Sequence, residues 1–147
     1  MPALVRGWKE RGLRHVAALA AELVDEHVAR PAADVIAYIP PDRDRQLTRG
    51  HHPAERLARE LARRWGLETA PLLGRAGRAA ARQTGLSLAE RRGNARGAFK
   101  AVTVPPPRVL LVDDVYTTGA TAAAAASALR AAGTSRIEVV TFARTVR

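Results

Sequence analysis

The chain has 147 residues, of which 47% are hydrophobic and 26% charged, and it contains no cysteine. This length and balance predict a single domain over residues 1–147 with a core that needs no covalent staples. The lack of cysteine excludes disulfides and thiolate metal sites. No apolar run reaches the roughly 18 residues of a membrane-spanning helix, and residues 1–14 mix charged with apolar side chains. We therefore expect no membrane span and a cytoplasmic location.

The formal net charge is +10, and arginine supplies nearly all of the positive charge. Three explanations are open: attraction of a polyphosphorylated small substrate, binding of nucleic acid, or the compositional habit of the source genome. Aromatic residues make up 4% of the chain and do not alternate with basic ones. This pattern gives little support to a stacking platform for single-stranded nucleic acid.

The hydrophobic periodicity predicts helices and strands that alternate along the chain. The expected order is helix 11–29, strand 35–39, helix 53–65, strand 67–73, strands 99–104 and 108–113, helix 121–132 and strand 137–142. Pro53 suits the first turn of a helix, and Gly133 suits the position just after one. Such alternation predicts an α/β fold, with a mainly parallel sheet flanked by helices on both faces.

Residues 74–97 lack sustained periodicity and contain six Arg against one Glu. One interpretation of Arg75–Arg96 is a mobile lid that closes over a bound substrate, with arginines such as Arg82 and Arg91 contacting its phosphates. The other is a solvated, charged face.

The most informative stretch is Val109–Thr121, with sequence VLLVDDVYTTGAT. Four apolar residues predict a buried strand that ends at Asp113 and Asp114, and an Ala-rich helix follows. The turn between them is expected to bind a phosphate through backbone N–H groups and hydroxyls, and Gly119 permits a close approach. The expected phosphate ligands are Val115, Tyr116, Thr117, Thr118, Gly119, Ala120 and Thr121. The two acids suit a neighbouring diol, so the pattern points to a ribose 5-phosphate.

Three other readings of this stretch are weaker. A receiver domain would need more strands than the thirty-three residues after Asp114 can supply. A nucleoside-triphosphate P-loop needs a Lys beside its last Gly, and none lies between Asp113 and Gly133. A plain helix cap would explain one Thr, but not two acids and three Thr around one Gly.

Residues 109–121 resemble the phosphoribosyl-diphosphate motif of the type I phosphoribosyltransferases, and the wider chain resembles their ComF-like branch. The supporting segments are Trp8–Gly12, Asp34–Pro41, Arg49–Gly50, Gln83–Ser87, Glu90–Arg92, Asn94 and Phe99. The Cys-rich zinc segment usual in ComF-like proteins is not found in this sequence. His51, His52 and Pro53 replace the family's aromatic and amide residues, and we expect both histidines to lie in a loop.

The resemblance implies binding of 5-phosphoribosyl 1-diphosphate with Mg²⁺ and transfer of the phosphoribosyl group to a nucleobase-like or amine acceptor. Asp113 and Asp114 would hold the ribose hydroxyls, which requires the chain to turn at Asp114, because adjacent strand residues face opposite ways. Mg²⁺ would be held mainly by substrate and water.

A second loop is expected to bind the pyrophosphate, and the residues that carry this prediction are Pro40, Pro41, Asp42 and Arg43. Its alternative is a plain turn with solvated charges. For the whole chain, the alternative function is a non-catalytic ComF-like protein that binds phosphoribosyl diphosphate or nucleotides and acts in competence and DNA uptake. Direct DNA binding and a homodimer stay open.

Overall fold

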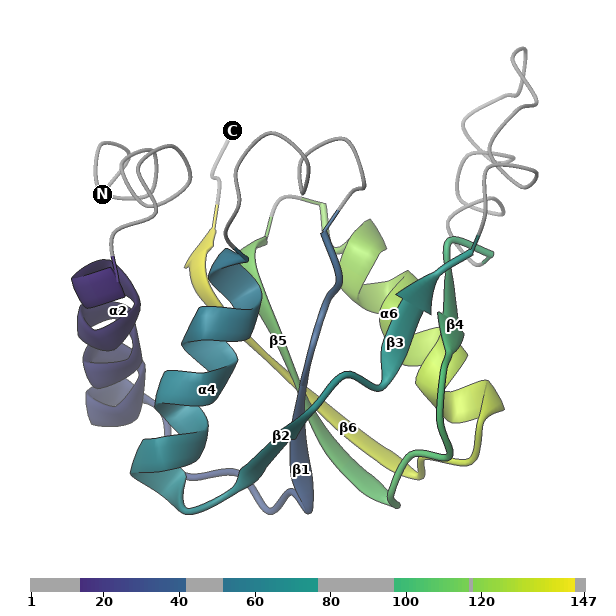
Figure 1. The fold of residues 1–147 in the computed structure, drawn as a ribbon, viewed down its shortest axis with the longest axis horizontal. Helices are drawn as coiled ribbons and strands as arrows, with labels where there is room; N and C mark the ends of the chain where they lie inside the picture. The colour runs from purple at the N-terminus through teal and green to yellow at the C-terminus, as the bar shows by residue number, and fades with distance from the viewer. Residues whose placement is uncertain (1–13, 42–51, 77–96, 117, 145–147) are drawn as a thin grey trace, which may run out of the picture.

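The structure is a computed structural model that describes residues 14–41, 52–76, 97–116 and 118–144 (Figure 1). In chain order the elements are α2 (Arg14–His27), β1 (Val35–Tyr38), α4 (Pro53–Trp65), β2 (Glu68–Ala70), β3 (Leu73–Arg75), β4 (Phe99–Ala101), β5 (Arg108–Tyr116), α6 (Ala120–Ala131) and β6 (Arg136–Arg144).

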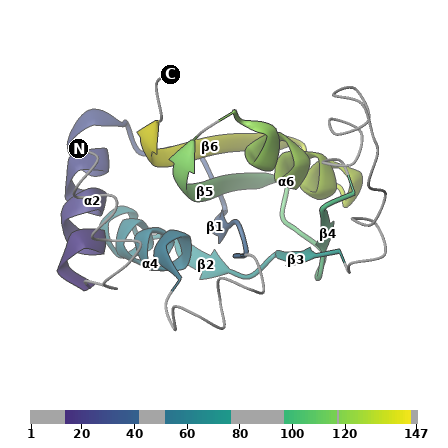
Figure 2. The ribbon, with the colours of Figure 1, turned by 90° about the horizontal axis from the view of Figure 1, so that it is seen from above.

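Four strands form a parallel sheet in the order β2-β1-β5-β6. The remaining two, β3 and β4, form a separate antiparallel pair. Figures 1 and 2 show α2 and α4 on one side of the sheet, and α6 with the β3–β4 pair on the other. The predicted fold class, a mainly parallel sheet flanked by helices, is confirmed.

The central strand β5 has apolar side chains on both faces, which is why it reads as a continuous hydrophobic run. Leu110 and Val112 are buried in the core with α2 and α4, whereas Val109 and Leu111 are buried in the core with α6. This strict alternation fixes which face each later residue of β5 occupies.

Helix α4 is bounded by the sequence signals that predicted it. Pro53 occupies the first turn, and Gly66 ends the helix in the left-handed conformation, with φ of 61°. One face of the helix is buried against the sheet, and the other carries exposed charges. The buried residues are Ala54, Leu57, Ala58, Leu61, Ala62 and Trp65.

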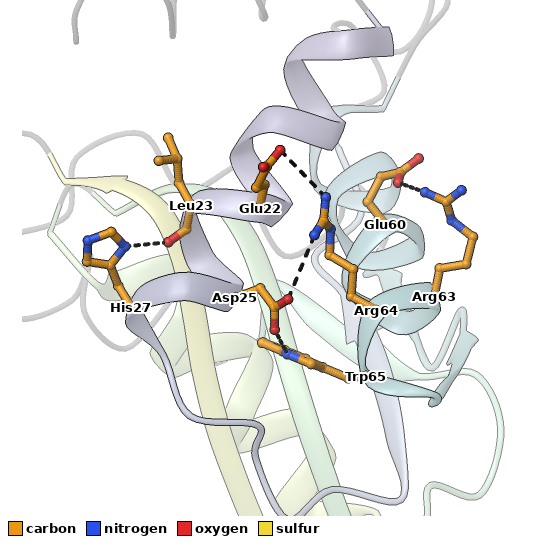
Figure 3. A network of polar contacts seen from close by, with 8 residues as sticks. All are labelled: Glu22, Leu23, Asp25, His27, Glu60, Arg63, Arg64 and Trp65. Carbon is orange, nitrogen blue, oxygen red and sulfur yellow. Dashed lines mark hydrogen bonds and ion pairs between the residues drawn. The ribbon is translucent and has the colours of Figure 1, made fainter.

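Helices α2 and α4 are joined by a polar network at the edge of their interface (Figure 3). The indole N–H of Trp65 donates to Asp25 Oδ1 at 2.5 Å, and Arg64 lies 3.8 Å from carboxylate oxygens of both Glu22 and Asp25. The Trp65 ring is buried, so this bond satisfies its polar atom where water has little access.

Two predicted strands are divided or shortened because they pair differently from the prediction. The expected strand 67–73 is divided at Pro71–Leu72 into β2 and β3, which belong to different sheets. The expected strand 99–104 is shortened to β4, because it pairs with the short β3 instead of extending the main sheet. In the part of the chain that the structure describes, no helix is long and apolar enough to cross a membrane.

Candidate functional site

The sheet topology itself marks one edge as the place for a ligand. The chain leaves β1 through α4 toward β2 on one side, and leaves β5 through α6 toward β6 on the other. Strands β1 and β5 are neighbours in the sheet, and the connections that follow them run to opposite sides. The two connections therefore separate between the C-terminal ends of β1 and β5 (Figure 1). Ligands of open α/β sheets bind at such a switch point, outside the carboxyl ends of the strands.

Both loops that the sequence singled out begin at this point. Pro40 and Pro41 follow β1, and the run that starts at Asp113 forms the end of β5. The N-terminus of α6 follows the same run. Acidic side chains, a glycine turn and a helix N-terminus therefore share one edge of the sheet with the proline loop.

Strand β5 extends further than predicted and does not end at Asp113. The pairs Asp113–Thr141 and Val115–Ala143 continue its ladder with β6 up to Tyr116. Because this register is regular, Asp113 falls on the α6 face and Asp114 on the face of α2 and α4. The predicted turn at Asp114 is therefore wrong, and a sugar that contacts both carboxylates has to lie across the end of β5.

Beyond the end of β1, the Asp113 carboxylate accepts a backbone N–H of β5 itself. The Val112 carbonyl accepts the N–H of Ile39 at 3.0 Å, close to the point where β1 ends. The N–H of Asp114 lies on this same edge of β5, since backbone groups two residues apart share an edge. It donates to Asp113 Oδ1 at 2.8 Å. This bond turns the half-buried carboxylate of Asp113 toward the switch point.

The turn after β5 has the geometry expected for an anion site. Gly119 lies in the left-handed region with φ of 75° and precedes α6 as its N-cap, without a side chain to cap the helix. Thr118 Oγ1 accepts the N–H of Ala120 at 3.4 Å, and the side chains of Thr118 and Thr121 are exposed. The first N–H groups of a helix have no carbonyl partner within it, so those that follow Ala120 can donate to an anion.

The helix starts at Ala120, one residue before the prediction. Of the predicted phosphate ligands, Thr117 lies outside the described residues, and Tyr116 is described only as backbone in β5.

The proline loop is attached to the β3–β4 pair by a residue that the sequence did not single out as a ligand. Arg75 Nε donates to the carbonyl oxygens of Pro40 at 3.2 Å and Pro41 at 3.1 Å. Its guanidinium also lies over the Phe99 ring, 4.9 Å from the centroid. The predicted pyrophosphate ligands Asp42 and Arg43, and residues 77–96 of the predicted lid with Arg82 and Arg91, lie outside the described residues. Arg75, where the predicted lid begins, belongs to β3 instead.

A second helix N-terminus, that of α4, carries a histidine cap. His52 Nδ1 accepts the N–H of Glu55 at 2.9 Å, and its ring meets that of Tyr38 edge to face, with centroids 5.2 Å apart. Burial, with a smaller contribution from Glu55, raises the pKa of Tyr38. His52 was expected in a loop; its position three residues before a Glu, at the start of a helix, is the signal that could have identified the cap.

The described residues contain no group of three or more His, Asp or Glu side chains that could enclose a metal ion.

The parallel sheet with helices on both faces, and the solved structures that match it, show a type I phosphoribosyltransferase fold. Two solved structures share it. A glutamine phosphoribosylpyrophosphate amidotransferase from B. subtilis, complexed with ADP and GMP, has a TM-score of 0.57 and 23% identity, over 88% of this chain and 25% of that one. A structure described as the allosteric regulatory enzyme of purine biosynthesis has a TM-score of 0.55 and 24% identity, over 86% of this chain and 25% of that one.

A sequence relative gives a narrower similarity. Competence protein F of Haemophilus influenzae is 30% identical over 141 residues, which are 93% of this chain and 62% of the relative. The chain thus spans less than two thirds of that protein's length. No protein-family model matches the chain. With the fold, this relative confirms the resemblance to the ComF-like branch of the type I phosphoribosyltransferases.

Proposed function

We propose that the chain binds 5-phosphoribosyl 1-diphosphate at the C-terminal ends of β1 and β5. One observation carries this proposal: the Asp113 carboxylate and the N-terminus of α6 lie at the same switch point, on either side of the Gly119 turn. A carboxylate accepts hydrogen bonds from a sugar diol, and helix N–H groups donate to a phosphate. A pentose phosphate is the ligand that needs both within a few residues.

In this arrangement the chain contributes three kinds of contact. The backbone N–H groups that begin α6, with the hydroxyls of Thr118 and Thr121, hold the 5-phosphate. Asp113 and Asp114 hold the ribose hydroxyls from the two faces of β5. The loop after β1 faces the remaining, diphosphate end of the ligand.

The donor set fits Mg²⁺ as a partner of the ligand better than as a resident ion. Two carboxylates next to one another in sequence are hard oxygen ligands, which Mg²⁺ prefers, yet they are too few to enclose it. When bound, Mg²⁺ would offset the charge on the pyrophosphate. The residues that would face its water shell are Asp113 and Asp114.

The reaction we propose is transfer of the phosphoribosyl group to a nucleobase-like or amine acceptor with release of pyrophosphate. Displacement at the anomeric carbon passes through a cationic sugar, so the chain's part is to hold sugar and leaving group in line and to exclude water. One structural neighbour supports this proposal, because it is a phosphoribosylpyrophosphate amidotransferase.

The match to a competence protein favours a second candidate. In it, the same site binds phosphoribosyl diphosphate or a nucleotide without catalysis, and the protein acts in competence and DNA uptake. Both candidates place the ligand in the same position, so binding tests their shared claim and turnover separates them.

Calorimetry with phosphoribosyl diphosphate and Mg²⁺ tests the shared claim. We expect the wild type to bind, and Asp113→Asn/Asp114→Asn to bind at least about tenfold more weakly, since each carboxylate supplies charge-assisted hydrogen bonds. Glu68→Gln is the matched control: Glu68 is an exposed acid that starts β2, at the opposite end of the sheet. Undiminished binding by the double variant would refute the site.

Release of pyrophosphate, screened against nucleobases and amines, then separates enzyme from sensor. An acceptor-dependent release that the double variant lacks establishes the transferase. Tight binding with no release above the rate without protein favours the non-catalytic candidate.

A further inference from the structure

We infer that Arg75 is a positioning residue that fixes Pro40 and Pro41, described residues of the loop after β1, for the diphosphate end of the ligand. This inference rests on the proposed function. It concerns a residue on the β3–β4 pair, outside the strand-loop-helix run that binds the pentose phosphate.

The loop cannot bind an anion through its prolines alone. Proline has no backbone N–H, so Pro40 and Pro41 offer carbonyl oxygens only. A carbonyl oxygen carries partial negative charge, and two of them turned toward a diphosphate would repel it. The orientation of these two carbonyls therefore matters for any anion that approaches the end of β1.

Arg75 sets that orientation. Its Nε donates to both carbonyls, at 3.2 Å to Pro40 and 3.1 Å to Pro41, and so draws their oxygens toward β3. The positive charge of the guanidinium also offsets their partial charge. A single donor shared between two consecutive carbonyls fixes the peptide planes of both residues.

The sheet pair holds Arg75 itself in place. Arg75 pairs with Phe99 across the β3–β4 ladder, and the guanidinium lies 4.9 Å from the centre of the Phe99 ring. Phe99 is buried in the core with α6, only 6% exposed. A planar guanidinium can stack on a ring and donate in its plane at once, whereas a lysine ammonium cannot.

Two ligands separate this role from a general electrostatic one. Ribose 5-phosphate reaches the diol and phosphate contacts but has no diphosphate, whereas phosphoribosyl diphosphate needs the loop as well. We expect Arg75→Gln and Arg75→Lys each to weaken binding of phosphoribosyl diphosphate about tenfold and to leave the affinity for ribose 5-phosphate unchanged.

Lys100→Gln is the matched control. Lys100 is exposed on β4 opposite Gly74, next to the Arg75–Phe99 pair. Its loss removes the same charge, and among the described residues it has no hydrogen bond to Pro40 or Pro41. We expect this variant to bind both ligands as the wild type does. Circular dichroism and thermal melts check that each variant is folded.

Each outcome of these measurements either supports or overturns the positioning role of Arg75. Equal affinity of Arg75→Gln and wild type for phosphoribosyl diphosphate overturns the inference and leaves the proposed function standing. Equal weakening for both ligands, or full recovery in Arg75→Lys, shows a role of charge or folding and also overturns it. A wild type that binds neither ligand overturns the proposed function, and the inference with it.

Discussion

Single residues decide whether the edge of the sheet can accept a phosphate. Gly119 is the clearest case, because its φ of 75° lies where side chains are strained. As the N-cap residue of α6, Gly119 also brings no side chain to this helix end, where Thr118 Oγ1 accepts the N–H of Ala120. The same residue therefore makes the turn possible and covers none of the N–H groups that follow.

We expect Gly119→Ala to lower the free energy of unfolding by about 1–2 kcal/mol, the cost of the left-handed conformation for a residue with a Cβ. Urea denaturation measures this change. The control is Gly97→Ala, since Gly97 is exposed and has nothing within 4 Å of an added Cβ. Equal stability of the two variants would show that the turn is not constrained as described.

At the opposite end of the sheet, Asp34 and Arg108 form an exposed pair that ties the start of β1 to the start of β5. Asp34 Oδ2 accepts the backbone N–H of Arg108 and Oδ1 its Nε, both at 3.0 Å. The side-chain bond from Arg108 is the main cause that lowers the pKa of Asp34 below its usual 3.8.

Because the pKa of Asp34 is lowered in the folded state, its contribution to the stability of the fold decreases at acid pH. The carboxylate stabilises the folded state fully above the unfolded pKa, near 3.8, and the contribution is lost as the pH falls through the lower folded pKa. We expect Asp34→Asn to melt below the wild type at neutral pH, and the difference to shrink toward pH ~3. A difference that stays constant with pH would exclude the ion pair as its cause.

At the scale of elements, the hydrophobic pattern was sufficient for most of the fold. Helix α4 was predicted with its observed limits, because Pro53, the apolar stripe and Gly66 are all local signals. The strand β5 was found by its apolar run, but its end was missed. The extension to Tyr116 depends on pairing with β6, which is distant in sequence.

The β3–β4 pair was missed for the same kind of reason. Residues 67–73 read as one strand, and only tertiary pairing divides them between two sheets. As a result, Arg75 was grouped with the charged segment that follows it and not with the loop after β1. The acid pair and the Gly119 turn are adjacent in sequence and could be predicted together; the contact of Arg75 with Pro40 spans 35 residues and could not.

The cap of α4 gives a prediction at this scale. We expect His52→Ala to lower the free energy of unfolding by about 1 kcal/mol, because the N–H of Glu55 loses its acceptor at the helix N-terminus. His52→Asn should restore most of it, since Asn is a strong N-cap residue. Thermal melts of the three proteins test this, and an Asn variant as unstable as the Ala variant would contradict a capping role.

At the scale of the whole molecule, the crossovers from β1 and β5 place the candidate site at one edge of the sheet. The ion pair of Asp34 with Arg108 belongs to the other edge, and the polar network of Trp65 joins α2 to α4 near the C-terminal end of α4 (Figure 3). These two structural contacts thus lie away from the candidate ligand contacts. A loss of binding can therefore be separated from a loss of stability caused at either of them.

The measurement that tests the location of the ligand most directly is hydrogen exchange with and without phosphoribosyl diphosphate and Mg²⁺. We predict slower exchange in peptides that cover residues 113–123, and in the amide of Ile39, with no change in α2. Protection confined to other parts of the chain, or no protection at saturating ligand, would contradict a pentose-phosphate site between β1 and β5.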